Sequence, residues 1–267
     1  MHFEEYWGLQ AAPFENVPDP KYYFPSTRHE EAIHRLLYGV QARKGAIMLT
    51  GEIGCGKTLL SRTLILHLAK MKYDIALIAD PSIGVAELLR ELLYQLGIED
   101  GGSKVELLHR LNSRLLENMK KGIDTVVIID EAQAIKDDQV FEELRLLLNF
   151  QLNDRFLLTL VLMGQPELRE RVLPIRQLAQ RIAIRYHLAP FGSEETARYV
   201  QARLKRAGCA RAEELFTKYA LLRIYQLSEG IARNINTLCD LCLLVGYMDK
   251  AEKVDVTVVE RAAQDLA

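Results

Sequence analysis

The segment from Gly51 to Thr58 has residue types and a spacing suited to holding phosphate. It reads Gly-Glu-Ile-Gly-Cys-Gly-Lys-Thr, which fits the pattern of glycine, four residues, glycine, lysine and then serine or threonine. Glycines tolerate positive φ angles, so consecutive backbone N–H groups can turn toward phosphate oxygens. The helix expected after the loop directs its positive N-terminal end at the same anion. The pattern therefore predicts a P-loop that binds a nucleotide.

The residue types within this segment predict separate roles. We expect Lys57 to reach the β- and γ-phosphates of ATP and the Thr58 hydroxyl to coordinate Mg²⁺. The other expected nucleotide contacts are Gly51, Glu52, Ile53, Gly54, Cys55, Gly56 and Leu59. The alternative is a glycine turn without a ligand. The flanking pattern, a strand at 46–50 and a helix at 58–71, favours the P-loop.

An apolar run with an acidic end follows at 125–131. The run from Thr125 to Ile129 is typical of a strand buried on both faces, and it ends in Asp130 and Glu131. Ligands of open α/β sheets bind at the carboxyl ends of strands. We therefore expect Asp130 to hold Mg²⁺ and Glu131 to polarise an attacking water, as in a Walker B motif. The alternative is a pair of acids that caps the next helix.

A third apolar run, at 157–163, ends in Gly164 and Gln165. In a parallel sheet this end faces the same edge as the phosphate loop, so the Gln165 amide could orient the attacking water. The alternative is a plain turn residue before Pro166.

Strand-like and helix-like segments alternate up to about residue 190. The expected strands are 46–50, 75–79, 125–129, 157–163 and 182–187, and the expected helices between them are 29–43, 58–71, 84–96, 104–121 and 142–152. Parallel strands need such helical crossovers. Beyond residue 190 the pattern is helical, at 193–208, 212–227, 230–248 and 255–266. We predict an α/β protein: a P-loop core with a parallel sheet flanked by helices, plus a small all-helical C-terminal lid domain.

The expected division has three parts. Residues 1–28, rich in proline and aromatic residues, form an irregular leader that packs on the core. Residues 29–190 form the ATPase core, and residues 191–267 form the helical lid.

Composition is that of an ordinary globular chain. Hydrophobic residues make up 49%, charged residues 26%, and the net charge is −2, which argues against a general polyanion binder. No apolar run approaches the roughly 20 residues needed to span a bilayer, so we expect a cytoplasmic protein without direct membrane insertion. Cys239 and Cys242, three apart in an expected helix, could be half of a metal site, but we favour core positions because no second pair follows.

The order of these motifs resembles that of AAA+ ATPases, and in more detail that of the general secretion pathway protein A family. The residues that carry the likeness are Tyr6-Trp7-Gly8-Leu9, Pro13-Phe14, Pro18-Asp19-Pro20, His29-Glu30-Glu31-Ala32, 45–58, Asp130-Glu131-Ala132-Gln133, Gly164-Gln165-Pro166-Glu167-Leu168, Leu178-Ala179-Gln180-Arg181, Tyr186-His187-Leu188 and 230–236. The resemblance covers nearly the whole chain. The Walker motifs are common to many ATPases, whereas the opening segment and Gly-Gln-Pro-Glu-Leu are more particular.

This resemblance implies further roles by position. Gln165 matches the sensor 1 residue, and Arg233 matches sensor 2, which touches the γ-phosphate. Arg181 matches the place of an arginine finger that acts on a neighbouring subunit, with Arg176 and Arg185 as rivals. The resemblance thus implies ATP and Mg²⁺ as cofactors and a homo-oligomer, a ring or a filament, that depends on nucleotide. Longer family members continue into a transmembrane helix and a periplasmic cell-wall-binding domain. We expect this sequence to be a short form that lacks these parts and does not act directly on peptidoglycan.

The sequence leaves two main classes of function open. The favoured one is an ATPase that drives assembly or remodelling of a secretion, pilus or exopolysaccharide-export machine, held peripherally at the inner membrane by its partner proteins. The alternative is a DNA-binding ATPase that regulates transposition target selection, suggested by ten Lys and Arg against four Asp and Glu between Gln165 and Arg211. A third reading, a nucleotide-gated scaffold with poor hydrolysis, is disfavoured by Glu131.

Overall fold

The computed structural model describes residues 3–266, and contacts divide the chain into two compact units. The core unit consists of Arg28–Gly51 and Lys57–Leu188, and the helical unit of Met1–Thr27, Glu52–Gly56 and Ala189–Ala267. The parallel sheet with flanking helices and the helical C-terminal region confirm the predicted fold class. Among residues 3–266, no helix combines the length and the apolar character that a membrane crossing requires.

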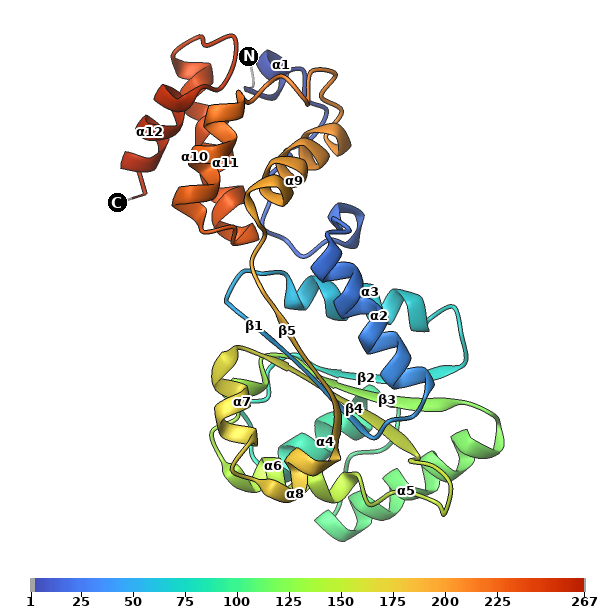
Figure 1. Ribbon diagram of the computed structural model, residues 1–267. Helices are drawn as coiled ribbons and strands as arrows, with labels where there is room; N and C mark the ends of the chain where they lie inside the picture. The colour runs from blue at the N-terminus through green and yellow to red at the C-terminus, as the bar shows by residue number, and fades with distance from the viewer. Residues whose placement is uncertain (1–2, 267) are drawn as a thin grey trace. The chain divides into compact units, whose positions relative to one another are not determined.

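The core unit is built on a sheet of five parallel strands in the order β2-β3-β4-β1-β5 (Figure 1). The strands are β1 (Ala46–Gly51), β2 (Tyr73–Ile78), β3 (Asp124–Ile129), β4 (Leu158–Gly164) and β5 (Ile182–Leu188). Every residue of β1 and β4 is buried, as their unbroken apolar sequence predicts for strands covered on both faces. Register pairs Thr50 with Gly164, so β1 and β4 end level with each other.

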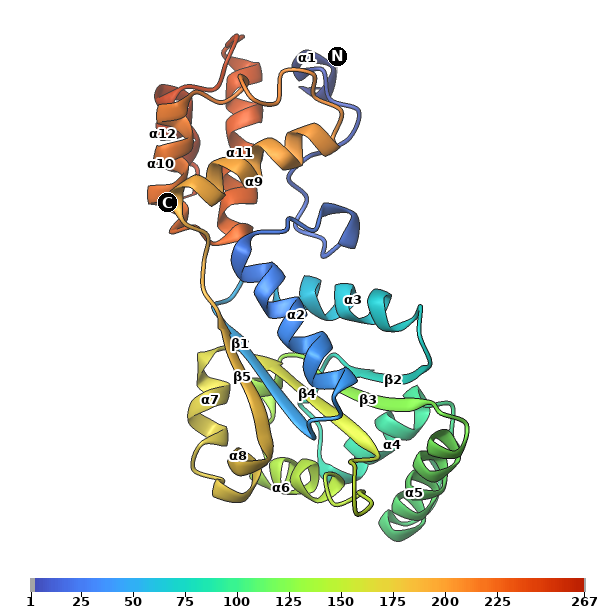
Figure 2. The same ribbon diagram turned by 45° about the vertical axis from the view of Figure 1, so that its right-hand side comes forward.

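Helices cover both faces of this sheet, with α2 and α3 on one side and α4, α6 and α8 on the other (Figures 1 and 2). Alternate residues of β1 serve the two faces: Met48 belongs to the core cluster with the second group, whereas Ile47 lies against Gly39 of α2. A Cβ at Gly39 would lie 2.5 Å from Ile47 Cδ1, so α2 packs directly on the strand. The helices of this unit are α2 (Thr27–Gln41), α3 (Lys57–Leu68), α4 (Val85–Gln95), α5 (Lys104–Lys120), η2 (Ala132–Ala134), α6 (Asp138–Leu147), α7 (Pro166–Val172) and α8 (Arg176–Arg181).

The helical unit includes the leader, and this corrects one expectation. Its elements are α1 (Phe3–Trp7), η1 (Pro20–Tyr22), α9 (Ser193–Arg206), α10 (Lys218–Ser228), α11 (Ala232–Met248) and α12 (Val256–Gln264). The leader was expected to pack on the ATPase core, but its described part packs on the C-terminal helices. Trp7 is 1% exposed and donates from Nε1 to the carbonyl of Leu243 at 2.9 Å. Gly246 makes room for this indole, because a Cβ there would lie 2.8 Å from Trp7 Cζ2.

A buried arginine secures the rest of the leader. Arg203 of α9 is 4% exposed, and its guanidinium donates to the backbone carbonyls of Pro13 at 2.5 Å and Glu15 at 2.7 Å. The same group lies over the ring of Tyr22, 4.2 Å from its centroid. Carbonyl dipoles and an aromatic face therefore stabilise this buried cation.

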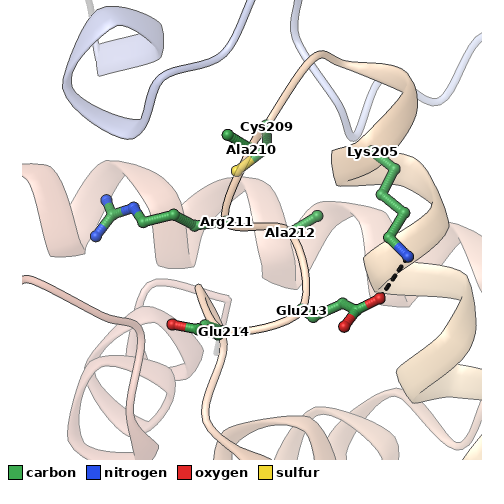
Figure 3. A pocket seen from close by; sticks show the side chains of 7 residues that line it. All are labelled: Lys205, Cys209, Ala210, Arg211, Ala212, Glu213 and Glu214. Carbon is green, nitrogen blue, oxygen red and sulfur yellow. Dashed lines mark hydrogen bonds and ion pairs between the residues drawn. The ribbon is translucent and has the colours of Figure 1, made fainter.

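Two predicted helices have different bounds in the structure. Residues 212–217 were expected to open the helix 212–227, but they belong to the loop before α10, part of which Figure 3 shows. Phe216 bridges to Val254, and Thr217 caps α10 by accepting from the backbone of Ala220, so the helix cannot begin earlier. The hollow of about 240 Å³ drawn there is bordered by the ion pair of Lys205 and Glu213.

The second case is the helix expected at 142–152, which is α6. Asp137 caps α6 by accepting from the backbone N–H of Gln139, so the helix begins at Asp138. It ends at Leu147 because the chain then turns into the Gln151–Phe156 bridge. The short helices α7 and α8, like η1, η2 and α1, were not predicted, because segments of three to seven residues carry too little periodicity.

Replacing Arg203 tests how the leader is held. We expect Arg203→Ala to destabilise the helical unit by about 2–4 kcal/mol, since hydrogen bonds from a charged donor and a cation–π contact are lost. Limited proteolysis should then cleave within residues 13–22, and thermal unfolding should begin at a lower temperature. Arg198→Ala, at an exposed position of the same helix, is the matched control. Equal protection of the leader in both variants would contradict this account.

Candidate active site

The predicted phosphate loop has the backbone conformation its glycines allow. Gly54 has φ 82° and Gly56 has φ 98°, values that residues with a Cβ rarely adopt. Lys57 is 4% exposed, and its Nζ donates to the carbonyl of Gly51 at 2.8 Å. The ammonium group therefore lies at the base of the loop, where β1 ends.

Arg233 meets this loop through its backbone. It is the second residue of α11, and its N–H donates to the carbonyl of Gly54 at 3.1 Å. A Cβ at Gly54 would lie 2.7 Å from the Cβ of Arg233, so a glycine is required for this approach. The Arg233 side chain is exposed. The sensor 2 role stays a prediction that this proximity supports.

Thr58 and Asp130 come together although they lie far apart in the sequence. Asp130 is 3% exposed and accepts hydrogen bonds from the Thr58 side chain and, at 2.9 Å, from the backbone N–H of Glu131. Burial raises the pKa of Asp130, and these two hydrogen bonds oppose the rise. A hydroxyl and a carboxylate are oxygen ligands of the type Mg²⁺ prefers, and a divalent cation would offset the burial of the charge. The residues present therefore fit the predicted metal ion.

Glu131 and Gln165 are joined by the side chain of Gln133, a residue to which the sequence analysis assigned no role. Glu131 has φ 49° and ψ 36°, the left-handed conformation, which is costly for a residue with a side chain. Its Oε2 accepts from Gln133 Nε2 at 2.5 Å. The backbone N–H of Gln165, the residue before α7, donates to Gln133 Oε1 at 2.9 Å. The sequence feature that could have indicated this role is an amide residue two positions after the Asp-Glu pair.

The three arginine-finger candidates differ in their surroundings. Arg181 is half-buried and donates from Nη2 to Asn149 Oδ1 at 2.7 Å. Arg185 donates to the carbonyl of Ala179. Arg176, at the start of α8, is exposed. If Arg181 reached into a neighbouring subunit, its contact with Asn149 would have to break. An arginine finger at Arg176 would require no such change.

Cys239 and Cys242 are buried within α11. Burial raises the pKa of both thiols, that of Cys242 to about 12, which disfavours the thiolate that a metal would require.

The sequence was compared with protein families and with known proteins. Residues 40–172 match the family described as AAA domain. The chain is also 39% identical over 270 residues to general secretion pathway protein A of Aeromonas hydrophila, an alignment that covers 99% of this chain and 48% of that protein. Residues 40–172 of the chain belong to the AAA domain family. The predicted resemblance is thereby confirmed, and this AAA+ chain spans about half the length of its curated relative.

Solved structures support the AAA+ fold. CDC6P from Pyrobaculum aerophilum matches with a TM-score of 0.70 at 17% identity, over 92% of this chain and 71% of that one. The Drosophila ORC structure bound to DNA matches with a TM-score of 0.68 at 19% identity, over 90% of this chain and 60% of that one. The ORC2 protein of Aeropyrum pernix in ADPNP–ADP complexes matches with a TM-score of 0.63 at 16% identity, over 90% and 67%. At these identities the likeness shows a shared fold and nothing about function.

The raised pKa of Asp130 has a consequence for stability. Because the charged form is penalised in the folded state, the contribution of this group is fully present below its ordinary pKa of 3.8 and is lost as the pH rises through the raised value. Asp130→Asn should therefore raise the melting temperature of the nucleotide-free protein at pH 7, while weakening Mg²⁺-dependent ATP binding.

The measurement is thermal unfolding between pH 4 and pH 8 without Mg²⁺, with calorimetric titration of ATP in its presence. The stability gain should shrink toward the acidic end of the range. Asp100→Asn, at an exposed position, controls for the loss of a charge alone. A variant that melts below the wild type at pH 7 would show that ionised Asp130 is well solvated.

Proposed function

We propose that this AAA+ protein binds Mg·ATP and hydrolyses it. The observation that carries the proposal is the hydrogen bond between Thr58, just after the phosphate loop, and Asp130, at the end of β3. A hydroxyl and a buried carboxylate in contact, together with a lysine whose ammonium group lies where β1 ends, form a set that phosphoryl transfer requires. The expected nucleotide contacts are 51–59 together with Arg233.

Each residue has a distinct part in the proposed reaction. Lys57 and the loop amides bind the phosphates, while Thr58 and Asp130 would hold Mg²⁺, which would supply positive charge next to the phosphate oxygens. Glu131 accepts a hydrogen bond from the attacking water and takes its proton. Gln165 orients that water from the end of β4, and Arg233 responds to the γ-phosphate. ATP and ADP would then favour different conformations around α11.

The similarity to general secretion pathway protein A suggests where this energy is used. We propose that the protein assembles or remodels a secretion, pilus or exopolysaccharide-export machine as a nucleotide-dependent homo-oligomer. In this proposal it lies in the cytoplasm and reaches the inner membrane through export-machine proteins.

The structure gives little support to the alternative, DNA binding in transposition target selection. Several of the basic residues behind it already have partners within the protein. Arg203 is buried, Arg171 pairs with Asp138 at 2.8 Å, and Lys205 pairs with Glu213 at 2.6 Å. Duplex DNA binding that falls steeply with salt would revive the alternative.

Glu131→Gln and Lys57→Ala separate chemistry from binding. Glu131→Gln keeps the size of the side chain but removes its basic charge, so it should bind Mg·ATP and lose turnover by roughly 10²–10⁴-fold. Lys57→Ala should lose ATP binding, because the charge facing the phosphates is gone. Calorimetry at millimolar Mg²⁺ and a phosphate-release assay give both values. Wild-type turnover in Glu131→Gln would remove it as the base, and wild-type affinity in Lys57→Ala would remove the P-loop assignment.

Arginine substitutions test the proposed oligomer. If a finger from a neighbouring subunit completes the site, turnover per subunit should rise with protein concentration, and its loss should spare ATP binding while slowing hydrolysis. Such fingers contribute about 10³–10⁵-fold in GTPases. Comparing Arg176→Ala, Arg181→Ala and Arg185→Ala identifies the residue, with Arg198→Ala as a control. Turnover that is independent of concentration in a strict monomer would contradict the oligomer.

A further inference from the structure

One side chain, Gln133, connects the proposed catalytic base to the end of β4. Its Nε2 donates to Glu131 Oε2 at 2.5 Å, and its Oε1 accepts from the backbone N–H of Gln165 at 2.9 Å. Both ends of one amide are thus engaged, one by a carboxylate and one by backbone. Its role concerns the proposed hydrolysis and depends on it.

The orientation of this amide follows from its partners. The backbone N–H of Gln165 can only donate, so the end of the Gln133 amide that faces it must be the oxygen. The NH₂ end then necessarily faces Glu131, whose carboxylate only accepts when ionised. A flipped amide would break both hydrogen bonds, so the backbone of Gln165 selects the orientation that serves Glu131.

The neighbouring residues leave space for this bridge and hold its backbone. A Cβ at Gly164 would lie 2.6 Å from Gln133 Oε1, so a glycine at the end of β4 allows the amide to approach. Arg171 of α7 donates from Nη1 to the backbone carbonyl of Gln133 at 3.2 Å and from Nη2 to Asp138 at 2.8 Å. Its guanidinium also lies over the ring of Phe141, 4.9 Å from the centroid. The η2 turn is therefore held from α6 and α7.

We infer that Gln133 is a positioning residue for Glu131. It holds Oε2 of the carboxylate and leaves Oε1 to accept the hydrogen bond from the attacking water. Through its contact with Gln165, it also ties the position of the base to the end of β4, which carries the proposed water-orienting amide. The backbone of Glu131, in the left-handed conformation, limits the rotamers of its side chain, and the contact with Gln133 selects one of them.

Two substitutions at Gln133 test this role in the full chain. Gln133→Met keeps the approximate length and removes both hydrogen bonds, whereas Gln133→Glu keeps an acceptor for the Gln165 N–H but places a second carboxylate against Glu131. Both should lower kcat for ATP by on the order of 10-fold to 100-fold, the range typical when the outer partner of a functional group is removed. The KM for ATP should stay unchanged, because neither partner belongs to the phosphate loop. Gln139→Met, at an exposed position of α6, is the matched control.

A double-mutant cycle separates positioning from a general structural effect. Residual turnover of Glu131→Gln and of Glu131→Gln/Gln133→Met is followed over hours with radiolabelled ATP. If Gln133 acts through the charge of Glu131, the second substitution should cause little further loss. Equal fractional losses in both backgrounds, or a rise in KM in place of a fall in kcat, would overturn the inference.

The outcomes for the two proposals are distinguishable. A wild-type protein without turnover would overturn the proposed hydrolysis and the positioning role together. Turnover that depends on Glu131 but is the same in Gln133→Met and wild type would overturn the positioning role alone. Hydrogen exchange of the Gln165 amide, which needs no ATP, reports the bridge itself: it should be faster in Gln133→Met, and equal rates would overturn the contact.

Discussion

Parallel strands bring their carboxyl ends to one edge of a sheet, and the strand order decides which ends become neighbours. Here β4 lies between β3 and β1, so the end of β4 lies between the acidic end of β3 and the end of β1 that leads into the predicted phosphate loop. Thr50 at the end of β1 is level with Gly164 at the end of β4. The strands cannot slip along each other without exposing apolar side chains, because β1 and β4 are buried along their whole length. The proposed ATP hydrolysis depends on this arrangement.

The groups gathered at this edge are kept there at a cost to stability. Asp130 holds a carboxylate that burial disfavours, and Glu131 has a backbone conformation that L-residues rarely adopt. Each is stabilised by hydrogen bonds from neighbours in the core unit: Thr58 for the first and Gln133 for the second. Such unfavourable features are typical of functional sites, where the surrounding packing maintains them.

The helical unit is stabilised by contacts between the leader and the C-terminal helices. Its core combines the C-terminal helices with a leader from the other end of the sequence, and Trp7 and Arg203 make contacts between them. Arg203 is neutralised by carbonyl dipoles and aromatic rings, so the contact depends on the path of the leader backbone more than on any one of its side chains. The segment Glu52–Gly56 of the predicted phosphate loop also groups with this unit, and Gly54 contacts Arg233 there.

Local sequence was sufficient for the features that depend on neighbours along the chain. The glycine pattern predicted the loop, and the apolar runs predicted β1, β3 and β4 to within about a residue, because burial on both faces demands an unbroken apolar sequence. Tertiary structure decided the rest. The start of α10 depends on Phe216 meeting Val254, the packing of the leader depends on Arg203, and the bridge from Glu131 to Gln165 depends on an amide that reaches across two strand ends. These contacts join residues that lie far apart in the sequence, and side-chain periodicity carries no information about which distant segments will meet.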